Sequence, residues 1–124
     1  MSIRPEQLAQ AVAKELAACE QEITDGVKQA VTQTARETTA ELRSASPKES
    51  GEYARGWKSR TVFESEGDIR LRVYNARKPQ LTHLLEFGHQ KQSGGRVEAK
   101  PHIRLARDHA EQKLLGRIKV VVKG

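Results

Sequence analysis

The stretch from Pro5 to Arg43 most constrains how this chain can fold, because its only glycine is Gly26 and it contains no proline after its first residue. Apolar residues recur in it at steps of three and four, which places them on one face of a helix. We therefore expect a long helix over residues 1–43, with Pro5 in its first turn and Gly26 as the point where it could bend. The expected apolar face comprises Leu8, Val12, Leu16, Cys19, Ile23, Val27, Val31, Ala35 and Leu42.

A helix of this length cannot bury its whole apolar face within a chain of 124 residues. It is expected to lie across a sheet, with its free end meeting a neighbouring subunit. Cys19 lies within the apolar face and is expected to be a small buried side chain. The alternative is a long coiled coil, but Glu15, Thr34 and Thr38 interrupt its seam.

Residues 44–56 are rich in serine, with Pro47 and Gly51, and are predicted to form a loop. Residues 57–74 then show two runs of alternating residues, which predict a β-hairpin. Glu64 to Gly67 would connect the strands. The alternation predicts that Trp57, Phe63, Leu71 and Val73 form the face beneath the long helix, and that Arg70 and Arg72 lie on the wet face.

Residues 75–100 contain one short apolar element, Leu81 to Phe87, predicted as either a helical turn or a strand and ended by Gly88. Residues 89–100, with Gly94 and Gly95 at their centre, are expected to form a mobile loop. Residues 101–124 are expected to form a second helix and a tail. Pro101 would begin that helix, Gly116 would cap it and Ile118 to Val122 would form a closing strand. Its apolar face would comprise Ile103, Ala106, Ala110 and Leu114.

These elements predict an α+β fold in which a long N-terminal helix and a C-terminal helix pack on a small antiparallel β-sheet. A chain of this length is expected to form a single domain, residues 1–124. Only 36% of its residues are hydrophobic and 4% aromatic, so part of its apolar surface is expected to be buried against partners. The sequence predicts no membrane-spanning segment and no signal peptide.

Charge is distributed unevenly along the chain. Residues 1–50 carry six Lys or Arg against eight Asp or Glu, whereas residues 51–124 carry sixteen against eight. A basic surface attracts phosphate polyanions and acidic protein faces alike. The second part of the chain could therefore face either DNA or protein, or simply be a solvated basic face.

The densest cluster of potential metal ligands is His83, Glu86, His89 and His102. Its spacing matches no known zinc signature, and Gly88 should end any helix before His89. Cys19, the single cysteine, has no Cys partner for an internal disulfide, and no nucleophile elbow or phosphate-binding loop occurs. We therefore expect no enzyme activity, no cofactor and no metal.

Basic residues are interleaved with aromatic residues between Tyr53 and Lys78, as on platforms that bind single-stranded nucleic acid. However, Trp57 shares the alternation of Phe63 and is expected to face the core. No recognisable DNA- or RNA-binding motif is present. A small basic DNA-associated protein remains the alternative function.

Two segments resemble a family of long-tailed bacteriophages, the gene-product-ten-like tail-completion or neck proteins. The first runs from Ser50 to Lys58. The second comprises Leu81 to His89, then Gly94-Gly95-Arg96-Val97, then Lys100 to Arg104. The order of long helix, glycine-containing start of the first strand, Glu-x-Gly turn, glycine loop and Pro-x-Ile helix start is similar to that of the family. His89 stands where many members have threonine, and Arg104-Leu105 also departs from the common pattern.

The resemblance implies a structural virion protein at the head–tail interface, assembled in the host cytoplasm. It implies a homo-oligomeric ring, expected to be a hexamer, that contacts head-closure and tail-terminator or tail-tube proteins, with genomic DNA in the channel as a further contact. Trp57 is expected in the core, Glu86 to cap backbone or pair with Arg104, and Gly88 to have a positive φ. His83, His89 and His102 would anchor the loop or contact other subunits. The structural or interface candidates are Trp57, Glu86, Gly88, His89, Gly94, Gly95, Pro101 and His102.

Overall fold

The computed structural model describes residues 4–48 and 51–124. Residues 1–3 of the expected first helix and residues 49–50 of the expected loop lie outside this range. The described elements are α1 (Pro5–Ala45), α2 (Glu52–Arg55), β1 (Trp57–Glu64), β2 (Ile69–Asn75), α3 (Leu81–Phe87), β3 (His89–Gln90), β4 (Arg96–Val97) and α4 (Ile103–Lys123). This confirms the α+β class, with a long N-terminal helix, a C-terminal helix and a small antiparallel sheet.

The long helix α1 runs without interruption through Gly26. Pro5 occupies its first turn, where a missing N–H costs no hydrogen bond, and the Gln7 side chain accepts a hydrogen bond of 3.3 Å from the Arg4 backbone N–H. The helix ends at Ala45 because Pro47 disfavours helical backbone in the residue before it. Ser46 accordingly has extended backbone angles, φ −70° and ψ 146°.

Strands β1 and β2 form an antiparallel hairpin with a bulge between Thr61 and Phe63. Up to the bulge, Trp57 and Ser59 share a face with Val73 and Leu71, and this face lies on α1. Beyond it, Phe63 pairs with Arg70 and Glu64 with Ile69. The extra residue therefore exchanges the two faces of β1.

The expectation that Phe63 lies beneath α1 is therefore wrong. The bulge places Phe63 on the outer face, where it is 48% exposed and the Arg70 guanidinium lies 5.5 Å from its ring centroid. Glu64 takes the inner face and its carboxylate lies 3.1 Å from Nζ of Lys28 in α1. Lys28 also donates a hydrogen bond to the backbone carbonyl of Ser65.

The C-terminal helix α4 is longer than the sequence predicts. Ile118 to Val122 is helical and not a closing strand, and Gly116 lies within the helix and does not cap it. Two further expectations are adjusted: α4 begins at Ile103, two residues after Pro101, and the expected loop of residues 44–56 contains the short helix α2.

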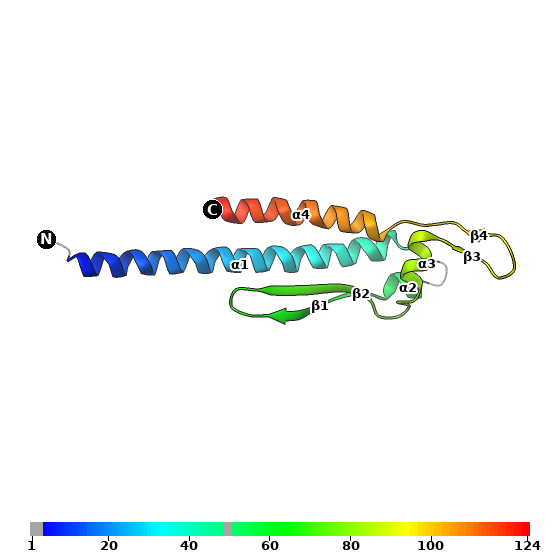
Figure 1. Ribbon diagram of the computed structural model, residues 1–124, viewed down its shortest axis with the longest axis horizontal. Coiled ribbons are helices and arrows are strands. Elements are labelled where there is room, and N and C mark those ends of the chain that lie inside the picture. Colours follow the sequence, from blue (N-terminus) through cyan, green and yellow to red (C-terminus); the bar gives the residue numbers. More distant parts are fainter. Residues whose placement is uncertain (1–3, 49–50) are drawn as a thin grey trace.

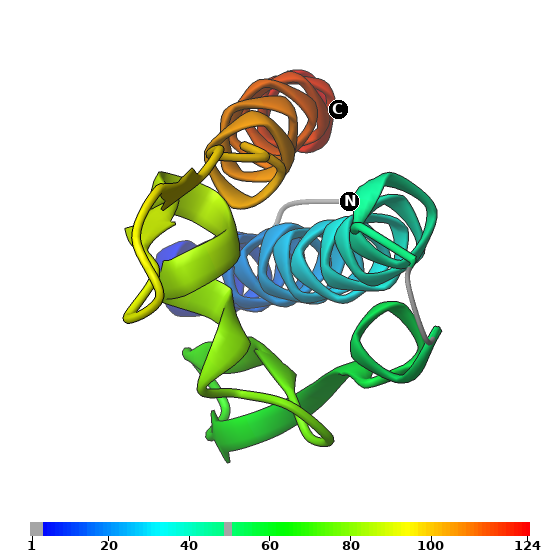
Figure 2. The same ribbon diagram turned by 90° about the vertical axis from the view of Figure 1, so that its right-hand side faces the viewer.

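Three layers are visible when the molecule is viewed along α1 (Figure 2). The β1–β2 hairpin lies on one side of α1, and α4 lies on the other side, antiparallel to α1. The core is at the end of α1 nearest to α2 and α3 (Figure 1). Leu42, Tyr53, Trp57 and Ala106 are buried there, with Val73, Leu81, Leu85 and Ile103 packed around them.

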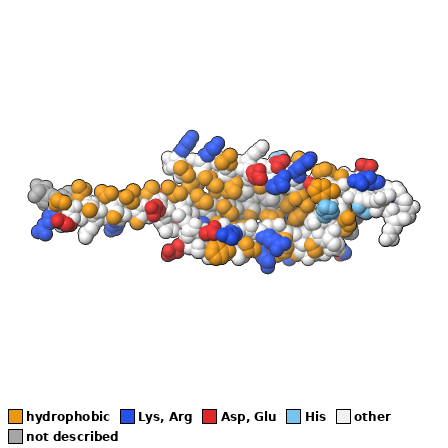
Figure 3. Space-filling view, viewed as in Figure 1, with side chains coloured by type: hydrophobic (Ala, Val, Ile, Leu, Met, Phe, Trp, Pro, Cys, Tyr) orange, Lys and Arg blue, Asp and Glu red, His pale blue; other side chains and the backbone are white. Residues whose placement is uncertain are grey.

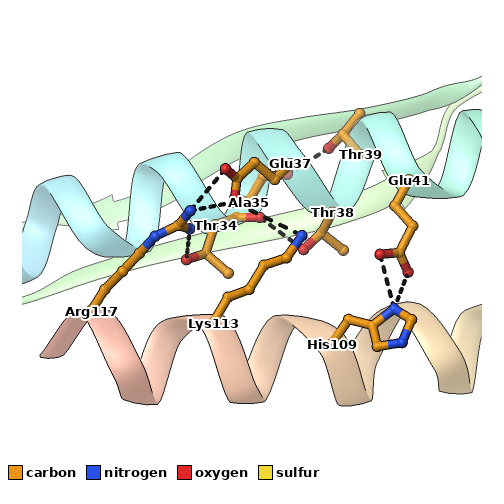
Figure 4. Close-up of polar contacts among 9 residues, drawn as sticks. All are labelled: Thr34, Ala35, Glu37, Thr38, Thr39, Glu41, His109, Lys113 and Arg117. Carbon is orange, nitrogen blue, oxygen red and sulfur yellow. Dashed lines mark hydrogen bonds and ion pairs between the residues drawn. The ribbon is translucent and has the colours of Figure 1, made fainter. Parts of the chain in front are cut away.

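Helix α4 lies close to α1 because Gly26 has no side chain. A Cβ at this position would be 2.7 Å from Cγ1 of Val121. Farther along the pair, Arg117 donates hydrogen bonds to the Thr34 hydroxyl at 2.8 Å and to the Glu37 carboxylate at 2.8 and 2.6 Å (Figure 4). Nδ1 of His109 lies 3.0 Å from both carboxylate oxygens of Glu41. Small residues and polar pairs thus join the two helices.

Candidate functional site

Glu86 binds the start of α4 from the neighbouring helix α3. Its carboxylate accepts hydrogen bonds from the backbone N–H groups of His102 and Ile103 at 2.8 Å each, and from that of Arg104 at 3.0 Å. The first N–H groups of a helix have no partner within the helix, and they favour a negative charge. Of the two roles expected for Glu86, the structure therefore shows the backbone cap, to which Arg104 contributes its backbone N–H group.

His102 lies beside this carboxylate and is only 1% exposed. Its Nδ1 lies 2.7 Å from the Lys100 carbonyl, and its Nε2 lies 2.7 Å from the Tyr53 hydroxyl. A carbonyl only accepts, so Nδ1–H donates to it, and Nε2 of a neutral ring then accepts from the Tyr53 O–H; this tautomer is assigned from the partners. The ring ties α2 to the segment before α4.

The surroundings of these groups shift their proton affinities. Burial raises the pKa of Glu86, but the three backbone hydrogen bonds outweigh this effect and hold the pKa below its ordinary value. Burial, with a smaller effect of the Glu86 charge, raises the pKa of Tyr53 well above its ordinary value. The carboxylate is thus ionised and the phenol protonated at neutral pH, which suits a structural role for both.

Gly88 ends α3 with a φ of 75°, the positive value expected from the sequence. A Cβ there would be 2.6 Å from the Val97 carbonyl oxygen. His89 then pairs with Val97, and its buried Nδ1 has no hydrogen-bond partner among residues 4–48 and 51–124.

The segment expected to be a mobile loop contains the β3–β4 hairpin. Gly94 and Gly95 form its turn with φ values of 92° and 83°. The Arg96 side chain donates a 3.0 Å hydrogen bond to the Phe87 carbonyl and so fastens the hairpin to α3.

A groove of about 640 Å³ lies between α3 and the beginning of α4. Pro101 lines it together with His83, Phe87 and Arg104. The His83 and Phe87 rings are in contact, with centroids 4.8 Å apart. His83 and Pro101 therefore belong to the surface of this region, and His102 to its interior.

Of the four potential metal ligands considered above, the structure brings Glu86 and His102 together, and both are occupied with backbone groups. In the part of the chain that the structure describes, no group of three such side chains could hold a metal ion.

Sequence reasoning missed two residues that build this region. Tyr53, expected only as part of a basic and aromatic series, is the partner of His102. Asn75 is buried at the end of β2, where its amide donates to the Tyr53 carbonyl at 2.7 Å and its side-chain oxygen accepts from the N–H groups of Arg77 and Lys78. These hydrogen bonds form a turn after β2. The sequence signal for this turn was an asparagine directly after a predicted strand and shortly before Pro79.

Residues 5–22 of α1, hereafter the α1 arm, extend beyond both α4 and the hairpin (Figure 1). All of them are exposed. Leu8, Val12 and Leu16 are 56%, 50% and 61% exposed, and apolar side chains run along this end of the molecule (Figure 3). Cys19 is also exposed, so its expected burial is wrong for this chain on its own. The helix continues the apolar periodicity past the elements that could cover it.

The outer face of the β1–β2 hairpin, hereafter the basic face, is the second uncovered surface. It carries Lys58, Arg60, Phe63, Arg70, Arg72 and Tyr74. The Arg60 guanidinium lies 5.4 Å from the Tyr74 ring centroid, in the same manner as Arg70 over Phe63. Trp57 lies on the opposite face, buried at 4% exposure, and donates a 2.8 Å hydrogen bond from Nε1 to Ser46.

The buried polar groups of this small α+β body bind backbone groups, and the helical arm and the sheet face are uncovered, as is typical of a structural protein that contacts partners. The chain belongs to the HK97-gp10-like family, whose sequence model, described as "Bacteriophage HK97-gp10, putative tail-component", matches residues 10–88. It is accordingly a structural component of a phage tail and of the virion, in a family that is not a class of enzymes.

The match extends from the α1 arm to Gly88, so the glycine turn and α4 lie beyond it. Comparison with curated proteins and with solved structures gave no match. Among the helices of the described residues, none is sufficiently long and apolar to cross a membrane.

Proposed function

We propose that this tail component joins head and tail at the neck of the virion, as a tail-completion or connector protein in a homo-oligomeric ring. The observation that carries the proposal is the uncovered apolar stripe of the α1 arm, with Leu8, Val12 and Leu16 each at least half exposed. Side chains of this kind in a helix are normally buried, so the stripe is suited to a contact that forms on assembly.

The arrangement of the chain supports a role between neighbours. The arm and the basic face are carried by one body, so a single copy can contact two neighbours at once. A ring, with six copies as the expected number, would use such a pair of surfaces in every subunit. Head-closure proteins on one side and tail-terminator or tail-tube proteins on the other are the proposed partners.

The test is electron microscopy of induced lysates from a lysogen whose prophage carries an early stop codon in the gene for this chain. A joining role predicts filled heads and finished tails that lie unattached. Complementation with the wild-type gene should restore complete virions. Normal intact virions from the stop mutant would exclude the role.

A matched pair of variants connects that test to the arm. Leu8→Gln/Val12→Gln/Leu16→Gln removes the stripe from a segment that no other described element covers, so the body should fold normally. Gln7→Ala/Gln10→Ala/Gln21→Ala changes polar residues of the same arm. Only the first variant should fail to complement the stop mutant.

The basic face favours a second candidate function, binding of genomic DNA in the channel or elsewhere. Four basic side chains next to two aromatic rings form a surface that could contact phosphates and bases. A dedicated DNA-binding protein would bind duplex or single-stranded DNA at near-physiological salt, with a steep dependence on salt concentration. A mobility-shift titration of the purified chain over a range of salt concentrations tests this candidate.

A further inference from the structure

We propose that the α1 arm of one copy docks on the basic face of a second copy, so that subunits join head to tail. This inference rests on the proposed ring and names the surfaces that form it. Both surfaces are uncovered in the described chain. Both carry apolar groups, and the acidic residues of one are matched by the basic residues of the other.

The arm combines an apolar stripe with acidic edges. At 3.6 residues per turn, Leu8, Val12, Leu16 and Cys19 fall on one side of the helix. Glu15 and Glu22 flank this stripe on one edge and Glu20 flanks it on the other, while Lys14 lies on the opposite side. The side that would meet a partner is therefore apolar at its centre and negative at both edges.

The basic face has the complementary composition. Lys58, Arg60, Arg70 and Arg72 supply four positive charges, all on exposed residues. Phe63 is 48% exposed, and Val62 at the bulge is exposed to the same degree. Arg70 forms an ion pair with Asp68, at 3.3 Å. The other three basic side chains of this face, Lys58, Arg60 and Arg72, have no ion pair among the described residues. Apolar contact and opposite charge can thus be satisfied together by the arm.

A second copy fits this face better than DNA because of the apolar groups, Val62 and Phe63, near the turn of the hairpin. A phosphate backbone would pair with the basic side chains but would leave Val62, and the arm's own stripe, exposed to water. Docking of the arm buries both. Acidic residues on the two edges of a helix also match a face on which basic residues occur on both strands.

The contact cannot form within one copy. The basic face points away from α1, and the arm extends past the hairpin along the axis of the same helix (Figures 1 and 2). A contact between two different surfaces of identical chains generates a closed ring or an open filament when it repeats head to tail, and a two-fold dimer when two copies exchange arms reciprocally. The proposed head-to-tail arrangement is the one that can close into a ring.

Cysteine cross-linking tests the contact, since Cys19 lies on the arm and is the only cysteine of the chain. Arg72→Cys places a second thiol at the centre of the basic face. With a short bismaleimide, purified Arg72→Cys should form a ladder of dimers and higher oligomers, with peptides linking Cys19 to position 72. The matched control Arg72→Cys/Cys19→Ser should lack this product, and so should Gln92→Cys, which places the thiol on an exposed residue away from the face.

A charge exchange provides the second measurement. By sedimentation velocity, Arg60→Glu/Arg72→Glu should weaken self-association by about tenfold or more, and adding Glu15→Lys/Glu22→Lys to the same chain should restore it. Wild-type dimers joined through Cys19 alone, or no product between positions 19 and 72, would overturn the proposal. Loss of DNA binding in Arg60→Glu/Arg72→Glu without any change in self-association would assign the face to DNA instead. Unattached heads and tails in the stop mutant would still support the neck role in either case.

Discussion

Val121 of α4 packs directly over Gly26 of α1, so closely that a Cβ on the glycine would be 2.7 Å from the valine Cγ1. A glycine within a helix is normally destabilising relative to alanine, and at this position it permits the approach of the second helix. The pair marks the last point at which α4 covers α1 before the arm begins.

Enlarging Gly26 should therefore separate the two helices. Gly26→Leu should lower the free energy of unfolding by about 1–3 kcal/mol, because the added side chain overpacks against Val121. Gly116→Ala is the matched control, since a Cβ there meets no atom within 4 Å, and it should stabilise the helix by about 0.5–1 kcal/mol. Urea denaturation followed by circular dichroism compares the two variants. Equal stabilities would contradict the close approach.

Removal of the Glu86 carboxylate should loosen the start of α4. Glu86→Ala leaves three backbone N–H groups without their acceptor and should cost about 2–3 kcal/mol. The folded-state pKa of Glu86 is lowered, so its stabilising effect is complete above the unfolded-state pKa of about 4.3 and is lost as the pH falls through the folded-state value.

Thermal melts between neutral and acidic pH check this prediction. The wild type should lose stability towards acid more steeply than Glu86→Gln. Glu98→Gln removes an exposed carboxylate from the adjacent segment and should follow the wild type. If wild type and Glu86→Gln had the same pH dependence, the Glu86 carboxylate would not be the source of the loss of stability towards acid.

The Tyr53 hydroxyl should remain protonated as long as the protein is folded. Its folded-state pKa is raised above the unfolded value of about 10, so the stabilisation is complete below that value and is lost as the pH rises above it. In Tyr74→Phe, which leaves Tyr53 as the only tyrosine, phenolate absorbance should therefore increase together with loss of the circular dichroism signal. Ionisation well before unfolding would contradict burial of the hydroxyl against His102.

Gly88→Val should impair folding, whereas His89→Ala should leave it intact. Valine is strained at a φ of 75°, and its Cβ would approach the Val97 carbonyl oxygen. His89 contributes a ring nitrogen that has no hydrogen-bond partner among the described residues, so its removal leaves no donor or acceptor unsatisfied. Melting temperatures of the two variants test the difference, and a Gly88→Val protein as stable as the wild type would refute the turn assignment.

Periodicity in the sequence was sufficient to predict α1 and the hairpin, and Gly88 was sufficient to predict where α3 ends. It failed at Phe63 because a bulge adds one residue without disturbing the alternation of residue types, and the faces exchange. It failed at Ile118 to Val122 because β-branched residues favour strands on their own, whereas here Ile118 and Val121 are partly buried on a helix.

The candidate site was partly predictable in the same way. A backbone-capping role for Glu86 was one of two alternatives expected from the sequence, and the sequence did not indicate that the capped N–H groups are those at the start of α4. The Tyr53–His102 hydrogen bond could not be predicted, because it joins residues 49 positions apart and depends on how α2 packs against α4.

The continuity of α1 through Gly26 has a mechanical consequence. One unbroken helix connects the arm to the core around Leu42, without the hinge that a break at the glycine would have provided. A partner that binds the arm therefore also fixes the orientation of the whole body, because the helix acts as a rigid lever. A torque applied at the arm would reach the core directly instead of being absorbed by a flexible tether.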